Sequence, residues 1–580
     1  MDKQPTTSKS GALSRFFKAT FFAGLLTSAF LLSSHTTFAG SATWQTSPGS
    51  GNWNTATNWM PNTVPNAPSD TGTFQSSNVT GVSLSANTAV NGIVFNAGAS
   101  AFTVTASPTF TLTISGVGIT NNSGIRQKFV TAFAGAGNEG HISFTGSATA
   151  GSQTLFTSTQ FFNTSTAGNG TFINDGATLF HDASTAGHGT FITNSGGAMR
   201  FDDSATADNG TFISNGGIPG RGGSIFFEGL SSASNGTFTA NGGTVGDALG
   251  AQINFEEDST ASNATFVING SAFSDPNAAA SLSFGGGTSP EQISTAGNAT
   301  LIANGVSGGV GGRIVFFYNC TGGTARVEVF GNGKLEVSPH DFPGMTIGSI
   351  EGDGIVILGR NNLTVGSNNL NTTFSGLIQD GLFPAGGSLT KIGKGKLVLR
   401  RANTYTGGTT VESGKLLINN KDGSGTGSGP VQVKGGKLGG KGEIAGAVTV
   451  GTGTGDGAVL APGYLHGIAS PGALTIQSNL TFNSDANYEV GMNSSSVMRD
   501  EVVALGVTIK GGAKFAFVDI GSGSLPAGTT FTVINNTAAT PIAGTFSNLP
   551  DGSTFTSNGN SFKANYQGGD GNDLTLKVVP

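Results

Sequence analysis

The chain has 580 residues, of which 95 are glycine and only 10% are charged, and its formal net charge is −6. Its 41 phenylalanines and the other apolar residues can form a buried core, which argues against a disordered chain, since such chains lack apolar residues and carry high net charge. The acidic balance provides no basic surface for nucleic acids or anionic membranes. Gly, Ser, Thr and Asn are abundant and are poor helix formers, so the composition indicates an all-β fold.

Residues 1–39 have the pattern of a secretory signal peptide. Basic residues precede an uncharged apolar run over residues 19–32, and Ala39 provides a small residue for cleavage. The run is short for a bilayer-spanning helix, so an N-terminal membrane anchor is the less favoured alternative. We therefore expect a mature chain that begins near Gly40, is secreted or held at the cell surface, and has no transmembrane anchor.

From about residue 140 to 320 the sequence repeats one unit. Each copy contains a strand ending in Phe, a Ser/Thr/Ala-rich corner, a strand with the motif Asn-Gly-Thr-Phe, and a Gly-rich return. The motif is found at residues 169–172, 209–212 and 235–238, with His-Gly-Thr-Phe at residues 188–191. A period of about 20 to 30 residues is typical of solenoids, whose units bury their apolar faces against their neighbours. We predict two short strands per coil of a parallel β-helix, with equivalent phenylalanines stacked inside at about 4.8 Å per coil.

Asn-Gly between apolar runs also signals β-hairpins, and regular short strands could form a sandwich or a propeller. The returns differ in length between copies, which favours a solenoid that inserts loops over stacked hairpins. We accordingly predict an N-terminal β segment over residues 40–110, β-helix repeats over residues 111–480 and a β-rich C-terminal cap over residues 481–580.

Residues 388–418 carry the most specific motif. The segment 388–399 reads SLTKIGKGKLVL, and the segment 402–416 reads ANTYTGGTTVESGKL. Together they closely resemble the autotransporter-associated β-strand repeat, also called the passenger-associated transport repeat. This resemblance implies a right-handed parallel β-helix of the kind found in passenger proteins that bacteria export to the cell surface.

Weaker resemblance to the same family is found at both ends of the predicted mature chain. The three tryptophans, Trp44, Trp53 and Trp59, lie in a segment that is similar to the start of such repeat proteins. Many passengers of the family are followed by a C-terminal translocator barrel, but after the strand predicted at residues 515–518 this sequence leaves no room for a set of barrel strands. The chain therefore resembles the members without a barrel, and we expect export by the general route.

One pattern could indicate a catalytic or calcium-binding site, because acidic residues directly follow the Phe-ending strand in consecutive copies of the repeat. These residues are Asp182, Asp202, Asp203, Glu228, Glu256, Glu257 and Asp258. Stacked coils would bring their carboxylates to separations that glycosidases use, and such a column could also bind calcium. The favoured interpretation is that they point to solvent at a corner and limit lateral aggregation. No apolar surroundings or aromatic sugar subsite can be assigned to them from the sequence.

A second pattern, Gly-Gly-Asp-Gly-Asn-Asp at residues 568–573, matches a calcium-binding repeat and includes Asp570 and Asp573. It occurs once, whereas calcium rolls need tandem copies, so it is predicted to be a turn. The six histidines show no zinc-binding spacing. Cys320 is the single cysteine, so no intramolecular disulfide can form, and it is interpreted as a small buried hydrophobe rather than a nucleophile.

These patterns predict an exported, non-catalytic, structural or adhesin-like protein of the bacterial surface or matrix, with no cofactor. The partners expected for it are glycans, components of the cell envelope or matrix, and further copies of itself, but not nucleic acids. Two alternatives remain open. One is a polysaccharide-acting lyase or glycosidase that uses the acidic column, and the other is a scaffold stabilised by calcium.

Overall fold

The computed structural model describes residues 40–135, 137–217, 220–285, 291–382, 385–455, 457–463 and 472–580. The predicted signal peptide lies outside the described residues. The described part contains strands β1 to β51 and two 3₁₀ helices of three residues each, η1 (Ala56–Asn58) and η2 (Pro276–Ala278). This confirms the predicted all-β class. Neither of these helical turns has the length needed to span a bilayer.

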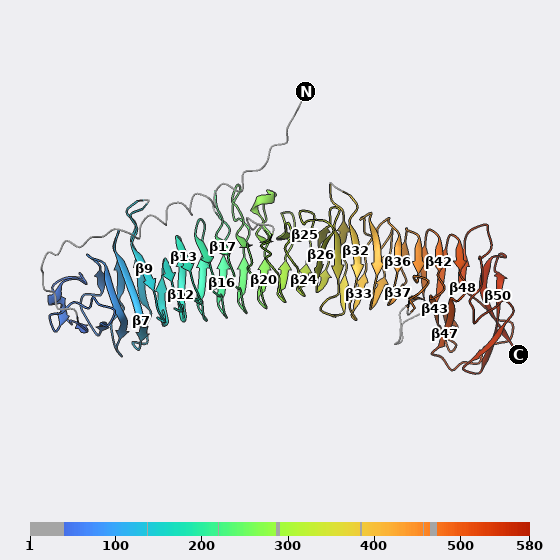
Figure 1. The fold of residues 1–580 in the computed structure, drawn as a ribbon, viewed down its shortest axis with the longest axis horizontal. Helices are drawn as coiled ribbons and strands as arrows, with labels where there is room; N and C mark the ends of the chain where they lie inside the picture. Colours follow the sequence, from blue (N-terminus) through green and yellow to red (C-terminus); the bar gives the residue numbers. More distant parts are fainter. Residues whose placement is uncertain are drawn as a thin grey trace, which may run out of the picture. The chain divides into compact units, whose positions relative to one another are not determined.

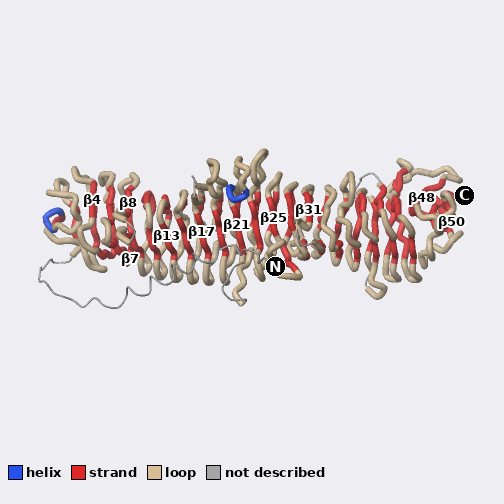
Figure 2. The backbone as a smooth tube through the Cα atoms, turned by 90° about the horizontal axis from the view of Figure 1, so that it is seen from above, coloured by secondary structure: helices blue, strands red, loops and turns tan. Residues whose placement is uncertain are grey.

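Strands that follow one another in the sequence belong alternately to two parallel sheets. β13 (Ala177–Phe180) pairs in parallel with β15 (Ala198–Phe201), whereas β14 (Thr190–Thr193), which lies between them in sequence, pairs in parallel with β16 (Thr211–Ser214). Within the unit that holds the described residues, the coils therefore succeed one another along one axis (Figures 1 and 2). This arrangement confirms the parallel β-helix and excludes the hairpin alternative for these repeats.

The two sheets keep this order through the repeat region. The first sheet includes β9 (His141–Phe144), β11 (Thr159–Phe161), β13, β15, β17 (Ser224–Phe227), β19 (Gln252–Phe255), β21 (Ser281–Phe284) and β23 (Arg313–Phe316). The second sheet includes β10 (Ser152–Phe156), β12 (Asn169–Asn174), β14, β16, β18 (Thr237–Ala240), β20 (Thr265–Ile268), β22 (Thr300–Ala303) and β24 (Arg326–Val329). Returns of unequal length change the number of residues between two paired strands, but they do not change the register in which those strands pair.

Each coil also has a third side that the sequence pattern did not reveal as a strand. In the Ser/Thr/Ala-rich stretch, a single residue per coil forms a parallel bridge to its counterpart in the next coil. This column consists of Thr149, Thr166, Thr185, Thr206, Ser232, Thr260, Thr295 and Thr321. Between the strands of the first and second sheets, later coils carry full strands of an eight-stranded sheet that begins with β26 (Gly344–Ile347) and β29 (Asn362–Val365). The predicted corner is thus a side that is one residue wide.

Two columns of phenylalanine fill the interior. Along the first sheet, stacked ring centroids lie 4.5–5.0 Å apart from Phe144 to Phe316. Along the second sheet the spacing is 4.4–5.0 Å from Phe129 to Phe266. Rings of the two columns meet edge to face at 5.6–5.9 Å, an arrangement that aromatic quadrupoles favour. The predicted phenylalanine ladder is therefore confirmed, and there are two of them.

Asparagines form a separate ladder where the Gly-rich returns begin. The Nδ2 group of Asn215 donates to Oδ1 of Asn194 at 3.1 Å, and Asn241 donates to Asn215 at 3.0 Å. Asn269 and Asn304 extend the ladder, each with a bond of 2.9 Å to the preceding asparagine. Each of these half-buried side-chain amides thus forms a hydrogen bond with the amide of the neighbouring coil, which limits the cost of removing polar groups from water.

The N-terminal end of the solenoid is closed by tryptophan side chains. Trp44, Trp53 and Trp59 are fully buried, and each contacts Phe74, the first ring under the phenylalanine columns. Parallel pairing already starts between β1 (Ala42–Trp44) and β3 (Thr71–Phe74), and it continues through β5 (Thr88–Phe95) and β7 (Thr111–Asn121) without a break at residue 110.

At the other end, parallel stacking runs past residue 480. β45 (Glu501–Ala504) pairs in parallel with β48 (Thr530–Asn536). The chain then turns antiparallel, because β48 pairs with β51 (Asp573–Val579), β51 with β50 (Asn560–Gly568), and β50 with β49 (Thr554–Ser557). These hairpins form the predicted β-rich cap at the end of the last coils.

The segment that resembles the transport repeat forms two successive coils. β32 (Ser388–Lys391) pairs in parallel with β34 (Gly408–Val411), and β33 (Lys396–Leu399) pairs in parallel with β35 (Lys415–Ile418). Lys391 is only 1% exposed, and its Nζ donates to the carbonyls of Ile392 and Gly393 at the corner. Gly414 has a φ of +72°, and a Cβ atom there would lie 2.2 Å from the carbonyl oxygen of Gly393 and 2.8 Å from this Nζ, so only glycine fits beside the ammonium.

The second half of the motif links neighbouring coils through polar side chains. Asn403 Oδ1 accepts from the backbone N–H of Ile378 at 2.8 Å, and its Nδ2 donates to the carbonyl of Gly425 at 2.7 Å. The buried hydroxyls of Tyr405 and Thr409 lie 2.6 Å apart. The residues that define the motif thus hold three coils together, which explains why the pattern needs these residue types.

Candidate functional site

The acidic residues singled out from the sequence lie at one corner of the coils, just after strands of the first sheet. His181, Asp202, Glu228 and Glu256 directly follow β13, β15, β17 and β19. Asp182, Asp203 and Asp258 are exposed, as expected, whereas Asp202, Glu228, Glu256 and Glu257 are half-buried. The interpretation that all of them point freely to solvent therefore needs correction for these four residues.

Some of these carboxylates hold the backbone of the neighbouring coil. Asp182 accepts from the N–H of Asn163 at 2.7 Å, and Asp203 accepts from the N–H of Asp182 at 3.0 Å. Glu257 accepts from the N–H of Gly229 at 2.9 Å. The acceptors have positive φ angles, +57° at Asp182, +54° at Asp203 and +56° at Glu257, a region that Asp tolerates better than most residues. This part of the column is therefore a structural ladder.

The residues beside the ladder form a charged cluster around Arg200, which points outward from β15. Its Nε lies 2.6 Å from Oδ1 of Asp202, and its Nη2 pairs with Glu228 on the next coil. His181 Nδ1 lies 3.2 Å from Oδ2 of Asp202 on the other side. The cluster thus joins three successive coils. Neither Arg200 nor His181 is among the residues that the sequence pattern singles out, because only the register of the coils brings them beside the acidic residues.

The cluster shifts the pKa values of its two central carboxyls, Asp202 and Glu228, in opposite directions. Burial acts to raise the pKa of Asp202, but hydrogen bonds from His181 and Arg200 outweigh it and keep that pKa below its ordinary value. Burial raises the pKa of Glu228 to about 7, because the attraction of Arg200 is opposed by Asp202, Glu256 and Glu257. An ionised carboxylate thus lies beside a carboxyl that titrates near neutral pH, a combination that acid–base catalysts use.

Metal binding has less geometric support. Within the described residues, no group of three or more Asp, Glu, His or Cys side chains is arranged to hold an ion. Asp258 accepts from the backbone N–H of Ile293 at 3.0 Å. Calcium would need six to eight oxygen ligands around one point, and carboxylates already bonded to the backbone are poorly placed to supply them.

The Gly-Gly-Asp-Gly-Asn-Asp segment is the turn between β50 and β51, in the antiparallel cap. Gly568 pairs with Asp573, and the N–H of Gly571 donates to the carbonyl of Gly568 at 2.8 Å. The Asp573 carboxylate accepts from the N–H of Asn536 at 2.9 Å, and burial raises its pKa. Asp570 lies in the same turn. The segment therefore has the turn geometry that the single copy predicted.

Cys320 is buried and forms no disulfide. Burial raises the pKa of its thiol to about 12, so the thiol stays protonated at neutral pH. Since the thiolate is the nucleophilic form, this environment suits a packing residue rather than a reactive one.

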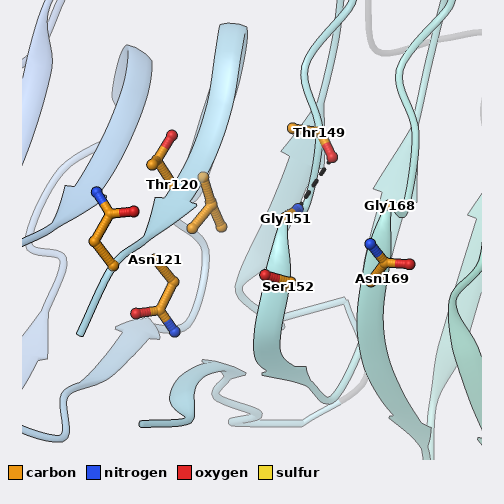
Figure 3. A pocket seen from close by; sticks show the side chains of 9 residues that line it. Thr120, Asn121, Thr149, Gly151, Ser152, Gly168 and Asn169 are labelled. Carbon is orange, nitrogen blue, oxygen red and sulfur yellow. Dashed lines mark hydrogen bonds between the residues drawn. The ribbon is translucent and has the colours of Figure 1, made fainter. Parts of the chain in front are cut away.

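A shallow groove of about 270 Å³ lies between the coils of β7 and β12 (Figure 3). Hydroxyl and amide side chains gather there, among them Thr120, Asn121, Ser152 and Asn169. The nine residues that line it include no charged side chain and no histidine or cysteine. The groove can offer hydrogen bonds to a polar ligand, but none of its lining residues is a general base that could activate one of its hydroxyls.

The comparisons with known proteins bear on one part of the chain. Residues 389–418, which form the coils of β32 to β35, match the family model of the passenger-associated transport repeat. The search of curated proteins found no match. Such a repeat points to a secreted or surface protein. The chain thus carries a segment that matches the passenger-associated transport repeat, and this segment lies within a long stack of parallel β-helical coils.

Proposed function

We propose that this protein is exported and acts outside the cell as a structural or adhesive β-helix, without catalysing a reaction. The observation that carries the proposal is the transport repeat at residues 389–418, which lies within one continuous stack of parallel coils. A stack of this kind displays side chains along an extended surface rather than in a deep pocket. Its partners would be glycans, components of the envelope or matrix, or further copies of the chain.

The contacts of the acidic residues support a non-catalytic role. Asp182, Asp203 and Glu257 bind backbone N–H groups of neighbouring coils, and Asp202 is held by Arg200 and His181. Carboxylates used in this way contribute to the fold, so their presence alone gives no reason to infer catalysis.

Cell fractionation of the tagged full-length chain tests export. We expect the protein in the medium or on the cell surface, with an N-terminus near Gly40, and a variant that lacks residues 2–39 should stay in the cytoplasm. Binding of the purified secreted protein to cells and to a glycan array tests adhesion. Retention of the full-length chain in the cytoplasm would overturn the proposal, and a failure to bind any surface would leave only the structural role.

One observation favours a second candidate, a polysaccharide-acting enzyme. Glu228, with a pKa of about 7, lies in a charged cluster with Arg200 and the ionised Asp202. In this alternative Glu228 would donate a proton to the glycosidic oxygen, and Arg200 would bind an acidic sugar. Release of reducing sugar from acidic polysaccharides by the wild type, lost in Asp202→Asn, Glu228→Gln and Glu256→Gln, would support the enzyme.

The calcium-stabilised scaffold is tested by thermal unfolding. A ligand that binds only the folded chain raises the melting temperature in proportion to the logarithm of its concentration above Kd. A rise with calcium that magnesium does not reproduce would support this alternative, whereas identical melting temperatures in calcium and in chelator would count against it.

A further inference from the structure

Two strongly exposed aromatic rings lie on neighbouring coils of the solenoid. Tyr318 is 57% exposed and Phe342 is 67% exposed, although most phenylalanines of this chain stack inside. Tyr318 forms a parallel bridge with His340, and the N–H of Asp341 donates to the carbonyl of Tyr318 at 2.8 Å. Exposed aromatic side chains on neighbouring coils are costly in water and commonly mark a binding surface.

A guanidinium extends the same corner by one more coil. Arg360 is exposed, and its Cζ lies 5.9 Å from the ring centroid of Phe342. Its coil is joined to that of Phe342, because the N–H of Asn362 donates to the carbonyl of Pro343 at 2.7 Å. Arg360 forms no ion pair with another described residue. It is therefore available to an anionic ligand while its guanidinium stays over the ring.

The backbone under this patch is held in place from several sides. The ring nitrogens of His340 lie 2.7 Å from the carbonyl oxygen of Asp341 and 2.9 Å from that of Cys320. Asn361 Nδ2 donates to the carbonyls of His340 at 2.8 Å and Val337 at 2.9 Å. A surface whose backbone is already ordered loses little entropy when a ligand binds.

We propose that Tyr318, Phe342 and Arg360 form a binding site for an extended glycan that carries carboxylate groups, such as a chain of uronic acids. The apolar faces of two sugar rings lie against Tyr318 and Phe342, and the guanidinium of Arg360 binds a sugar carboxylate through two parallel hydrogen bonds. The exposed Asp341 carboxylate accepts hydrogen bonds from sugar hydroxyls. This inference rests on the proposed adhesive function and names its surface.

Size and spacing favour a glycan over a protein partner. The patch occupies three adjacent coils, whose rise of about 4.8 Å per coil is close to the length of one sugar in an extended chain. Three side chains cover far less than the roughly 800 Å² per partner that a stable protein interface buries. The unpaired guanidinium favours an acidic chain over a neutral one.

Calorimetric titration of the purified secreted protein with a galacturonic acid hexamer tests the site. A fully methyl-esterified hexamer serves as the matched neutral ligand. We expect the acidic hexamer to bind at least tenfold more tightly than the ester, and Arg360→Gln to remove most of this difference. Tyr318→Ala and Phe342→Ala should each weaken binding of the acidic hexamer at least tenfold.

Phe133→Ala is the control, because Phe133 is 70% exposed but lies in a separate loop that bridges Glu139. This variant should bind like the wild type, and circular dichroism should show that all variants keep the fold. The proposal is overturned if the wild type binds neither hexamer, if Tyr318→Ala binds normally, or if a hexapeptide of glutamate binds as tightly as the acidic hexamer. If Tyr318→Ala still adheres to cells like the wild type, the proposed binding site is wrong, whereas the proposed adhesive function still stands.

Discussion

Truncating one phenylalanine of the second column tests whether the stacked rings carry the stability of the solenoid. Phe212 is fully buried, with stacked neighbours Phe191 at 4.9 Å and Phe238 at 4.4 Å and an edge-to-face contact to Phe201 at 5.9 Å. Truncation of a buried Phe to Ala typically costs about 3–5 kcal/mol. Each lost ring contact adds about 0.5–1.5 kcal/mol beyond burial, so we expect Phe212→Ala to fall in the upper half of that range.

Urea denaturation followed by circular dichroism measures this loss as a change in the free energy of unfolding. Phe212→Leu should cost less than half as much, because Leu301 occupies the equivalent position in β22, paired with Phe266. The exposed control Phe133→Ala should stay within about 0.5 kcal/mol of the wild type. A loss below about 1 kcal/mol for Phe212→Ala, or equal losses for the Ala and Leu variants, would refute the reasoning.

Three further predictions concern the polar residues. Burial lowers the pKa of Lys391 to about 8 from its ordinary 10.5, so between these pH values the unfolded chain binds this proton more than the folded chain does. The stability of the folded chain therefore rises with pH in this interval, and the melting temperature of the wild type should rise relative to that of Lys391→Met. Burial raises the pKa of Glu228 to about 7 from 4.5, so between these pH values the folded chain binds this proton more than the unfolded chain does. The free energy of unfolding should therefore fall as the pH rises from 4.5 to 7, and urea titrations of Glu228→Gln should lack this decrease. Asp203→Ala removes the acceptor for the Asp182 N–H and places alanine at a φ of +54°, so it should lower the free energy of unfolding by about 2 kcal/mol. Asp203→Asn keeps an acceptor and tolerates this φ, so it should change the free energy of unfolding by less than about 0.5 kcal/mol.

Local, repeated patterns were sufficient to predict the coil. The Asn-Gly-Thr-Phe motif places Phe172 and Phe212 at matching strand positions, and their inward stacking follows once parallel coils are assumed. The transport repeat was likewise recognisable, because Lys391 and Asn403 belong to a motif whose residue types are required by contacts within two or three coils. Signals of this kind lie within one or two repeat units, so a single sequence contains them.

Other features could not be predicted, because they depend on contacts between residues whose separation in the sequence differs from one repeat to the next. The third side of the coil has one bridging residue, such as Thr185, which is too short to show strand periodicity. Arg200 meets Glu228 across 28 residues, and Tyr318 lies beside Asp341 across 23 residues, because returns of different length separate them. Only the register of the coils shows that these side chains are neighbours.

The register also explains how one fold can carry different chemistry along its length. The core residue at the end of each strand of the first sheet stays phenylalanine from β11 to β23. The residue directly after it differs from coil to coil and is, in chain order, Phe162, His181, Asp202, Glu228, Glu256, Gly285 and Phe317. Because core and corner lie on opposite sides of the backbone, a corner side chain can change without altering the stacked rings beneath it. Selection for binding can therefore act on a column of corner residues while the core keeps its packing, so a functional site on this solenoid is to be sought along its corners rather than in a pocket.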